Sequence, residues 1–308
     1  MIVDRTWLDW ETDGRAWPHR EASQFHSTCG YRWHVQTFGH RQAPVLVLLH
    51  GTGAASFSWR TLVPLLQERF HVVVPDLPCH GFTRPLDDAD LSLEGMTASL
   101  HGLLRHLKVR PDFVLGHSAG AVIALALAAA IRHTSDGRAG QVQMVFGVNG
   151  ALEPIRGKRL LSPIAKALFA TPLSASMFSL LAKATPLGSN LLAATGSKID
   201  PEGQALYRLL LGSSGHVHGA LGMMAAWDLS QLPAMLRRLP VSLALLAARD
   251  DPMVPAKSSE HAAALCRDAR LTMAETGGHL LHECDPERVH AWISAALHDR
   301  RKNGSDAA

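Results

Sequence analysis

Val114-Leu115-Gly116-His117-Ser118-Ala119-Gly120 places a Gly-x-Ser-x-Gly motif between an apolar run that begins at Phe113 and an apolar helical pattern over residues 119–131. A strand that turns sharply into a helix with a serine at the apex forms a nucleophile elbow. The serine backbone is strained there, and the strand and helix pass too close for large side chains, which explains the two glycines. The stretch therefore predicts a nucleophilic hydroxyl at Ser118.

The composition of the 308-residue chain indicates a globular protein with a sizeable core. Hydrophobic residues make up 47% of the chain and charged residues 19%, which argues against disorder. The length suits one large α/β domain with an insertion, or two small domains. A formal net charge of +3, a pI near 8.8 and the lack of a Lys/Arg block argue against a nucleic-acid partner.

The sequence also predicts where the protein works. Its N-terminus, Met1-Ile2-Val3-Asp4, carries an early acid and no hydrophobic signal core. The longest apolar run, over residues 119–131, is shorter than the roughly 20 residues that span a bilayer. We therefore expect a soluble, cytoplasmic protein. The cysteines are scattered, which predicts reduced thiols rather than disulfides or a zinc site, and we expect neither a metal nor a cofactor: Cys29, Cys79, Cys266 and Cys284.

Strand-like and helix-like patterns alternate along most of the chain. The run over residues 45–49 is continuously apolar, as expected for a strand buried on both faces. Strands are predicted at residues 23–28, 32–38, 45–49, 71–75, 113–115, 141–148, 241–247 and 270–275, and helices at 91–107, 119–131, 257–266 and 286–298. The alternation predicts an α/β fold with a mostly parallel central sheet flanked by helices.

The alternation stops between residues 151 and 239. This stretch contains helical patterns broken by prolines and by Gly196, and no obvious strand. We therefore predict a core domain formed by residues 1–150 and 240–308. Residues 151–239 would be a helical cap, inserted before the penultimate strand of the core.

Two neighbouring aspartates follow the strand predicted at 241–247. A catalytic serine needs a base, usually histidine, and the carboxylate that orients this base is expected just past such a strand. Asp250 and Asp251 are both candidates. The Asp-x-x-Val-Pro spacing that ends in Val254-Pro255 favours Asp251, and Asp250 would then be a turn or N-cap residue.

Histidines near the C-terminus provide the candidate base. His279 follows two glycines after the last predicted strand, so its ring can lie in a loop above the sheet, whereas His282 is the alternative. A serine, an acid and a histidine then occur in this order, each at the end of a strand. They predict a catalytic triad of Ser118, Asp251 and His279.

Backbone N–H groups should stabilise the negative charge that develops on the substrate oxygen. Ala119, at the start of the helix after Ser118, would supply one donor. The loop His50-Gly51-Thr52-Gly53-Ala54 follows a buried strand, and its opening favours the N–H of Thr52 as the second donor. Gly53 and His117 adjoin these donors, and we expect them to contact the substrate.

Taken together, these motifs resemble the α/β-hydrolase family over nearly the full chain. The resemblance implies the Ser118–Asp251–His279 triad and a helical cap, and it implies chemistry on a small-molecule substrate. Cys79 departs from the pattern, because many relatives carry glycine there, and the turn could differ slightly. The matching segments are 50–53, 76–81, 116–120, 251–255 and 278–279.

A narrower resemblance is to the magnesium-chelatase accessory proteins of bacteriochlorophyll biosynthesis in phototrophic bacteria. It rests on segments 17–23, 32–36, 50–54, 75–83, 116–121 and 215–225. The resemblance implies a role beside the insertion of Mg²⁺ into protoporphyrin IX, with chelatase subunits or the porphyrin as partners. A fold does not by itself define a reaction.

The predicted cap is basic as well as apolar. Between residues 151 and 199 there is one acid and six bases, which gives a net +5: Glu153 against Arg156, Lys158, Arg159, Lys166, Lys183 and Lys198. Such a cap suits a porphyrin with carboxylates, peripheral contact with an anionic membrane, or simple solvation. His216 and His218 lie in a Gly-rich segment that we expect to be a loop, where they could face a substrate.

Three hypotheses follow from the sequence. The protein is a serine hydrolase of a small apolar ester or related carbonyl compound. Alternatively, it assists the chelatase or its porphyrin with a triad that is inherited but not essential. A third hypothesis is membrane association through the cap.

Overall fold

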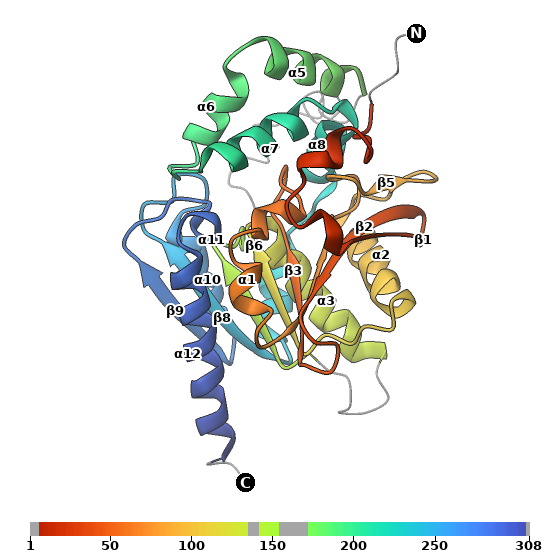
Figure 1. Ribbon diagram of the computed structural model, residues 1–308. Coiled ribbons are helices and arrows are strands. Elements are labelled where there is room, and N and C mark those ends of the chain that lie inside the picture. Colours follow the sequence, from red (N-terminus) through yellow and green to blue (C-terminus); the bar gives the residue numbers. More distant parts are fainter. Residues whose placement is uncertain (1–5, 135–141, 154–171, 306–308) are drawn as a thin grey trace.

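A computed structural model describes residues 6–134, 142–153 and 172–305 (Figure 1). Within these ranges the strands form one mixed sheet in the order β1-β2-β4-β3-β6-β7-β8-β9, with β5 paired to β2. The strands are β1 (Ser23–Thr28), β2 (Tyr31–Phe38), β3 (Val45–Leu49), β4 (His71–Pro75), β5 (Arg84–Pro85), β6 (Phe113–His117), β7 (Met144–Val148), β8 (Ser242–Ala248) and β9 (Ala269–Ala274).

Most of the sheet is parallel, as the alternation of strands and helices predicts. The pairs from β4 through β3, β6, β7 and β8 to β9 are all parallel. Only the β1–β2 hairpin and the pairs of β2 with β4 and β5 are antiparallel. The carboxyl ends of β3, β6, β7, β8 and β9 therefore lie along one edge, where the residues that follow these strands can meet.

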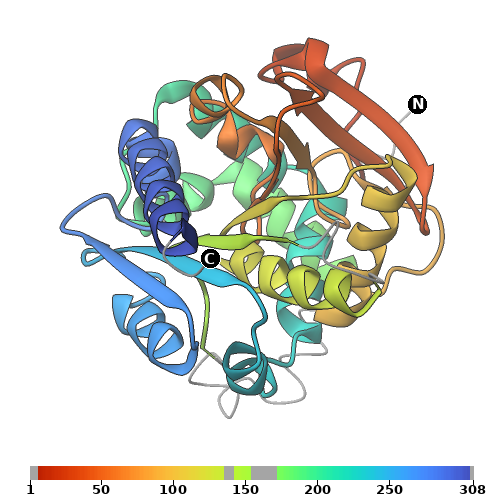
Figure 2. The same cartoon turned by 90° about the horizontal axis from the view of Figure 1, so that it is seen from below.

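Helices cover both faces of the sheet (Figure 2). The main ones are α1 (Val63–Leu66), α2 (Leu93–His106), α3 (Ala119–Thr134), α10 (Ala256–Leu265), α11 (Leu281–Cys284) and α12 (Pro286–Ser305). On one face α2, α3 and α10 share a core with alternate strand residues such as Val47 and Leu49. On the other face α1 and α12 pack on Leu46 and Leu48. The two-residue period explains why the continuous apolar run of β3 is buried on both faces from Leu46 to Leu49.

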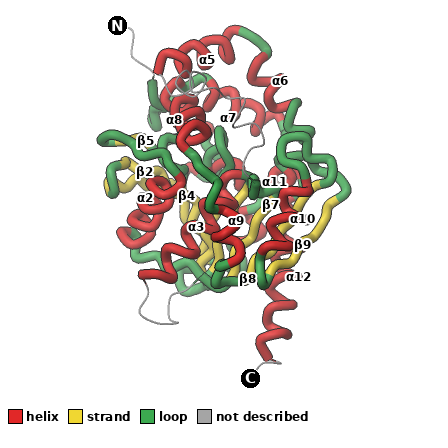
Figure 3. The backbone as a smooth tube through the Cα atoms, turned by 180° about the vertical axis from the view of Figure 1, so that it is seen from behind, coloured by secondary structure: helices red, strands yellow, loops and turns green. Residues whose placement is uncertain are grey.

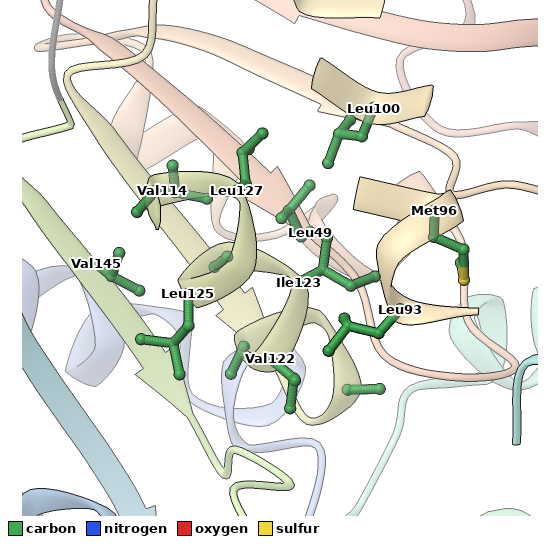
Figure 4. Close-up of a cluster of buried hydrophobic side chains, with 14 of the residues drawn as sticks. Leu49, Leu93, Met96, Leu100, Val114, Val122, Ile123, Leu125, Leu127 and Val145 are labelled. Carbon is green, nitrogen blue, oxygen red and sulfur yellow. The ribbon is translucent and has the colours of Figure 1, made fainter. Parts of the chain in front are cut away.

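Helix α3 is at the centre of the hydrophobic core that it shares with α2 and α10 on one face of the sheet. Figure 4 shows Val122, Ile123 and Leu125 of α3 among side chains from β3, β6, β7 and α2. Every non-polar side chain of this set is removed from water, which contributes roughly 1.5–3 kcal/mol for each large side chain before entropy is counted. This burial fixes the helix against the strand that precedes it, and with it the turn at Ser118.

In the described part of the segment between β7 and β8, the regular elements are helices, as predicted. This part contains α5 (Pro172–Ala184), α6 (Leu187–Ala193), α7 (Pro201–Leu211), α8 (Ser214–Ala226) and α9 (Leu232–Arg237). Helices α5 to α8 lie above the carboxyl edge of the sheet, and α5 packs on α8 (Figure 1). Helix α9 instead contacts α3 and α10 of the core (Figure 3). The domain boundaries at 150/151 and 239/240 stay a prediction.

Two further expectations concern covalent bonds and membranes. All four cysteines are free thiols. No helix in the described ranges is long and apolar enough to cross a lipid bilayer.

Candidate active site

The turn from β6 into α3 has the geometry that the Gly-x-Ser-x-Gly motif predicts. Ser118 has φ 52°, a left-handed conformation that is strained for a residue with a side chain. A side chain on Gly116 would collide with the backbone of Gly120, and one on Gly120 would collide with the carbonyl of Leu49. Both glycines are therefore required by backbone packing, and the serine lies at the apex.

Ser118 lines a cavity of about 430 Å³ between the sheet edge and the inserted helices. Among the described residues that line it there is no Lys, Arg, Asp or Glu. Its walls are mainly apolar side chains from α6, α7, α8 and the loops after β8 and β9: Leu191, Leu192, Leu211, Met223, Met224, Trp227, Leu229, Met253, Val254 and Leu280. Such a cavity favours an uncharged, apolar ligand.

His279 also lines this cavity, and it is held by an aspartate. Its Nδ1 lies 2.8 Å from Oδ2 of Asp251, whose side chain is buried. The other oxygen of Asp251 accepts hydrogen bonds from the N–H groups of Met253 at 2.8 Å and Val254 at 3.0 Å. Because the carboxylate occupies Nδ1, Nε2 of His279 is the nitrogen left to exchange a proton with a hydroxyl.

The two aspartates have different partners. Asp250 does not contact His279 through its carboxylate; its oxygens accept the N–H groups of Gly277 at 3.1 Å and Gly278 at 2.9 Å. It thus fixes the glycine turn that presents the histidine. The structure therefore pairs His279 with Asp251, the aspartate favoured by the Asp-x-x-Val-Pro spacing.

The alternative histidine lies elsewhere. His282 is fully buried, with its ring centroid 4.5 Å from that of Trp59 and 4.2 Å from that of His117. Burial lowers its pKa well below the usual value, so the ring is neutral. It is not among the residues that line the cavity.

Asn149, which the sequence analysis did not identify, holds the backbone of the histidine loop. Its Nδ2 donates to the carbonyl oxygens of Gly278 and His279, both at 2.9 Å, and its Oδ1 accepts the N–H of Ala248 at 2.8 Å. Like Ser118, Asn149 adopts a left-handed conformation, with φ 47°. The sequence feature that could have identified Asn149 is an asparagine directly after a buried strand, since asparagine tolerates the left-handed conformation.

His117 provides a second contact to the same loop. Its Nε2 lies 2.9 Å from the carbonyl oxygen of His279 and must carry a proton to donate to it. Burial is the main cause that lowers the pKa of His117 well below its usual value. A neutral ring with the proton on Nε2 satisfies both observations. His117 also lines the cavity beside Ser118, and the loop residue Gly53 does so too.

The predicted donors for a substrate oxygen lie beside the serine. Thr52 and Ala119 both line the cavity, and within the described residues neither backbone N–H donates to a protein acceptor. His50 shapes the loop, because its Nδ1 donates to the carbonyl of Gly51 at 2.8 Å and its Nε2 accepts the N–H of Leu77 at 2.9 Å. Two free N–H groups next to a nucleophile are suited to stabilise an oxyanion.

The prediction that His216 and His218 lie in a loop is wrong, because both belong to helix α8. Neither residue lines the cavity. His216 is buried instead between two loops of the core: its Nδ1 accepts the N–H of Gly81 at 3.0 Å, and its Nε2 lies 3.2 Å from the carbonyl of Gly53. It therefore joins a cap helix to the loop that carries Thr52.

The departure at Cys79 is accommodated locally. Cys79 has φ 60°, in the left-handed region that glycine prefers. Helix α8 approaches this turn so closely that a side chain on Gly219 would collide with the carbonyl of Cys79. The turn thus keeps a glycine-like conformation, and the missing side chain at 219 makes room for the helix.

A polar cluster, buried except for Asp200, connects the cap to the core beside the cavity. Arg60 contacts Glu283 and Asp200, each at 2.7 Å, and the hydroxyl of Tyr207 donates to Glu283 at 2.6 Å. Burial raises the pKa of Glu283 to about 7 despite the opposing effect of Arg60. Since the Tyr207 ring lines the cavity, the cluster fixes one wall.

Comparisons with known proteins agree with this architecture. Residues 46–292 match the model of the alpha/beta hydrolase family. The chain is 38% identical over 279 residues to the magnesium-chelatase 30 kDa subunit of Rhodobacter capsulatus, covering 90% of this chain and 95% of that protein. It is 28% identical to a putative carbamate hydrolase, RutD, of Pseudomonas syringae, covering 80% of this chain and 91% of that protein.

Solved structures share the fold at low sequence identity. A putative lipase from Acinetobacter baumannii superposes with a TM-score of 0.75 at 18% identity, covering 98% of this chain and 99% of the other. An alpha/beta hydrolase fold protein from Burkholderia ambifaria gives a TM-score of 0.71 at 23% identity, covering 88% and 97%.

If Asn149 positions the histidine loop, replacing it should slow the reaction at Ser118. This loss of rate should be larger than any loss of folding stability explains. We expect Asn149→Ala to reduce the rate of fluorophosphonate labelling at Ser118 by roughly ten- to a hundredfold, because a shift of about 1 Å in a base can cost that much. Labelling rates would be measured across pH 6–9. Asn190→Ala, at an exposed position of α6, is the matched control. Equal rates for Asn149→Ala and the wild type would contradict this role.

His216 predicts a pH-dependent stability. Burial lowers the pKa of His216 from 6.5 to about 4, so between these values the unfolded chain binds more protons. Stability should therefore fall as the pH drops from 6.5 towards 4, by a total on the order of 3 kcal/mol from this group. His216→Gln keeps a donor and an acceptor but cannot titrate, so its urea-unfolding free energy should depend less on pH.

The control for this effect is His298→Gln, at an exposed position of α12. It should leave the pH dependence of unfolding as in the wild type. The assignment to His216 fails if both variants show the same slope of stability against pH.

Proposed function

The chain belongs to the alpha/beta hydrolase family, and we propose that it is an accessory protein of a magnesium chelatase with a working serine-hydrolase site. The accessory role is supported by the 38% identity to a magnesium-chelatase subunit over 90% of the chain. The proposal places the protein in the cytoplasm, with chelatase subunits as partners.

The single observation that carries the hydrolase part is the pair of His279 and Asp251 beside Ser118. The pair is 2.8 Å apart, and Ser118 and His279 line one apolar cavity. A strained serine, a histidine and a buried carboxylate have no structural need to converge there, whereas acyl transfer needs all three.

In the proposed reaction, Ser118 Oγ attacks a carbonyl carbon while Nε2 of His279 takes the hydroxyl proton. Asp251 stabilises the imidazolium, and the N–H groups of Thr52 and Ala119 hold the oxyanion. The tetrahedral intermediate collapses as His279 gives the proton to the leaving group, which departs and leaves an acyl-serine. Water then attacks the acyl-serine and loses a proton to His279. The second tetrahedral intermediate collapses as His279 returns this proton to Ser118 Oγ, which releases the acid and regenerates the serine.

The cavity narrows the choice of substrate. A carboxylate buried among the apolar side chains that line it would find no cationic partner among the described lining residues and would cost several kcal/mol. The lining therefore supports a small uncharged ester or related carbonyl compound. It argues against a porphyrin with ionised carboxylates as the occupant of this cavity.

A fluorophosphonate probe tests the hydrolase part. We expect the wild-type protein to be labelled and Ser118→Ala to be unlabelled, with His279→Ala labelled at least about a thousandfold more slowly, as for known triads. Labelling would be followed by intact-mass spectrometry. A wild-type protein that reacts no faster than Ser118→Ala would refute the active serine.

Complementation then separates catalysis from a non-catalytic role. In a strain that lacks this protein, Ser118→Ala should fail to restore pigment synthesis if hydrolysis is the contribution. Full rescue by Ser118→Ala would refute this and favour an accessory role without catalysis.

Helix α5 favours a second role, in peripheral membrane contact. Its side chains Leu173, Met177 and Leu180 are 76%, 59% and 66% exposed, and their spacing places them on one face. The sequence from 154 to 199 has no acid; four of its six bases lie outside the described residues, and Lys183 and Lys198 are exposed. An exposed apolar face in a basic segment suits an anionic lipid surface.

Vesicle sedimentation tests this role. Vesicles with 30% phosphatidylglycerol should bind the wild type at low salt and release it as salt increases. We expect Leu173→Glu with Leu180→Glu to weaken binding at least about tenfold. Leu86→Glu, at an exposed leucine after β5, should bind normally. Failure of the wild type to sediment at any salt concentration would exclude the contact.

A further inference from the structure

A second cavity, of about 1020 Å³, lies at the amino edge of the sheet. It is lined by residues that immediately precede β7, β8 and β9, including Gln143, Val241 and Asp268. Because β6 to β9 are parallel, this edge is opposite to the one where Ser118 follows β6. Figure 2 views the molecule from this side. We call this cavity the amino-edge groove.

The rim of the groove is cationic. Four arginines line it, from α3, the end of α9, the turn before β9 and α12: Arg132, Arg238, Arg267 and Arg300. Asp268 is the one acid among the described lining residues, so the formal charge is four minus one, or +3. Within the described ranges, none of the four arginines has a carboxylate partner within the 4.0 Å of an ion pair.

Apolar side chains line the same groove. We call Val142, Met235, Leu239 and Val241 its apolar floor. Two arginines have only neutral partners: Arg300 donates to the side-chain oxygen of Gln143 at 2.8 Å, and Arg132 reaches a backbone carbonyl at 3.5 Å. No side-chain hydrogen bond to a described residue engages the guanidinium groups of Arg238 and Arg267, which leaves their donors available to a ligand.

We propose that the amino-edge groove binds an apolar molecule that carries two or more carboxylates. The apolar floor would take the body of the ligand, and the arginines would pair with its carboxylates through charge-assisted, often bidentate, hydrogen bonds. Tetrapyrroles with propionate groups belong to this class. Their choice as the probe rests on the proposed function, whereas the charge and the apolar floor do not.

The two cavities then divide the ligands by charge. The cavity at Ser118 has no charged side chain among its described lining residues, so it disfavours a carboxylate. The amino-edge groove offers four cations around a non-polar floor. The anionic ligand and the substrate of Ser118 therefore occupy opposite edges of the sheet and do not compete.

A structural role is the competing explanation for two of the arginines. Arg132 lies in the last turn of α3 and Arg238 directly follows α9, where a cation also stabilises the helix dipole. If the arginines only stabilise the helix dipoles, replacing them should lower the melting temperature of the protein and leave its affinity for the ligand unchanged. Arg267 lies in a turn rather than at a helix end, so it distinguishes the two explanations.

The test is a titration of the full-length protein with protoporphyrin IX, followed by the shift of its main absorption band. The dimethyl ester of the porphyrin, which lacks ionisable carboxylates, is the ligand control. We expect the wild type and Ser118→Ala to bind the acid with equal affinity. Arg238→Ala with Arg267→Ala should bind it at least about tenfold more weakly, since each charged hydrogen bond contributes about that much or more.

A matched double variant controls for lost surface charge. Arg249→Ala with Arg288→Ala removes two arginines that are ion-paired elsewhere on the surface, and it should bind like the wild type. The proposal is overturned if the wild type does not bind, if the dimethyl ester binds equally well, or if both double variants bind alike. Arg238→Ala with Arg267→Ala should leave fluorophosphonate labelling of Ser118 as in the wild type. An error in the groove proposal and an error in the hydrolase proposal would therefore give different results.

Discussion

The site depends on one steric constraint, the contact of bare backbone between β6, α3 and β3. Gly116 and Gly120 allow this contact, and the chain can then turn only by taking Ser118 into the left-handed region. The apolar core around α3 stabilises the contact and offsets the strain, which costs about 1–3 kcal/mol. Because α3 begins at Ala119, directly after the serine, its first free N–H is held next to the reactive hydroxyl.

The remaining parts of the site use the same edge of the sheet. Three neighbouring parallel strands, β7, β8 and β9, are followed by Asn149, by Asp251 and by the turn before His279, so each strand positions one group. Asn149 hydrogen-bonds across to the histidine loop, while Asp250 fixes the glycine turn of that loop. A rigid frame of strands thus fixes groups that are far apart in sequence, as preorganised chemistry requires.

The regular parts of the fold were predictable because their signals are local. Apolar runs and helical spacing gave β3, β4 and α2 nearly to the residue, and the family comparison confirms the fold class. The triad and oxyanion roles stay predictions, although the structure brings Asp251 and His279 together. Asn149 and the Arg60–Glu283 pair were missed because their meaning lies in contacts across long sequence separations. The helix around His216 was missed because a segment rich in glycine is typical of a loop. In the structure these glycines allow close packing, with Gly219 against Cys79 and Gly215 against Trp7.

The position of the cap in the chain also has a consequence for how the protein folds. β7 ends at Val148 and its parallel neighbour β8 begins at Ser242, so the whole cap forms the loop that must close before they pair. Such non-local pairing is entropically costly and slow. We expect the sheet up to β7 to form first, with Asn149 hydrated until β8 and β9 join. A nascent chain would therefore expose an unpaired β7 edge, which makes the late arrival of the C-terminal strands the step most open to aggregation.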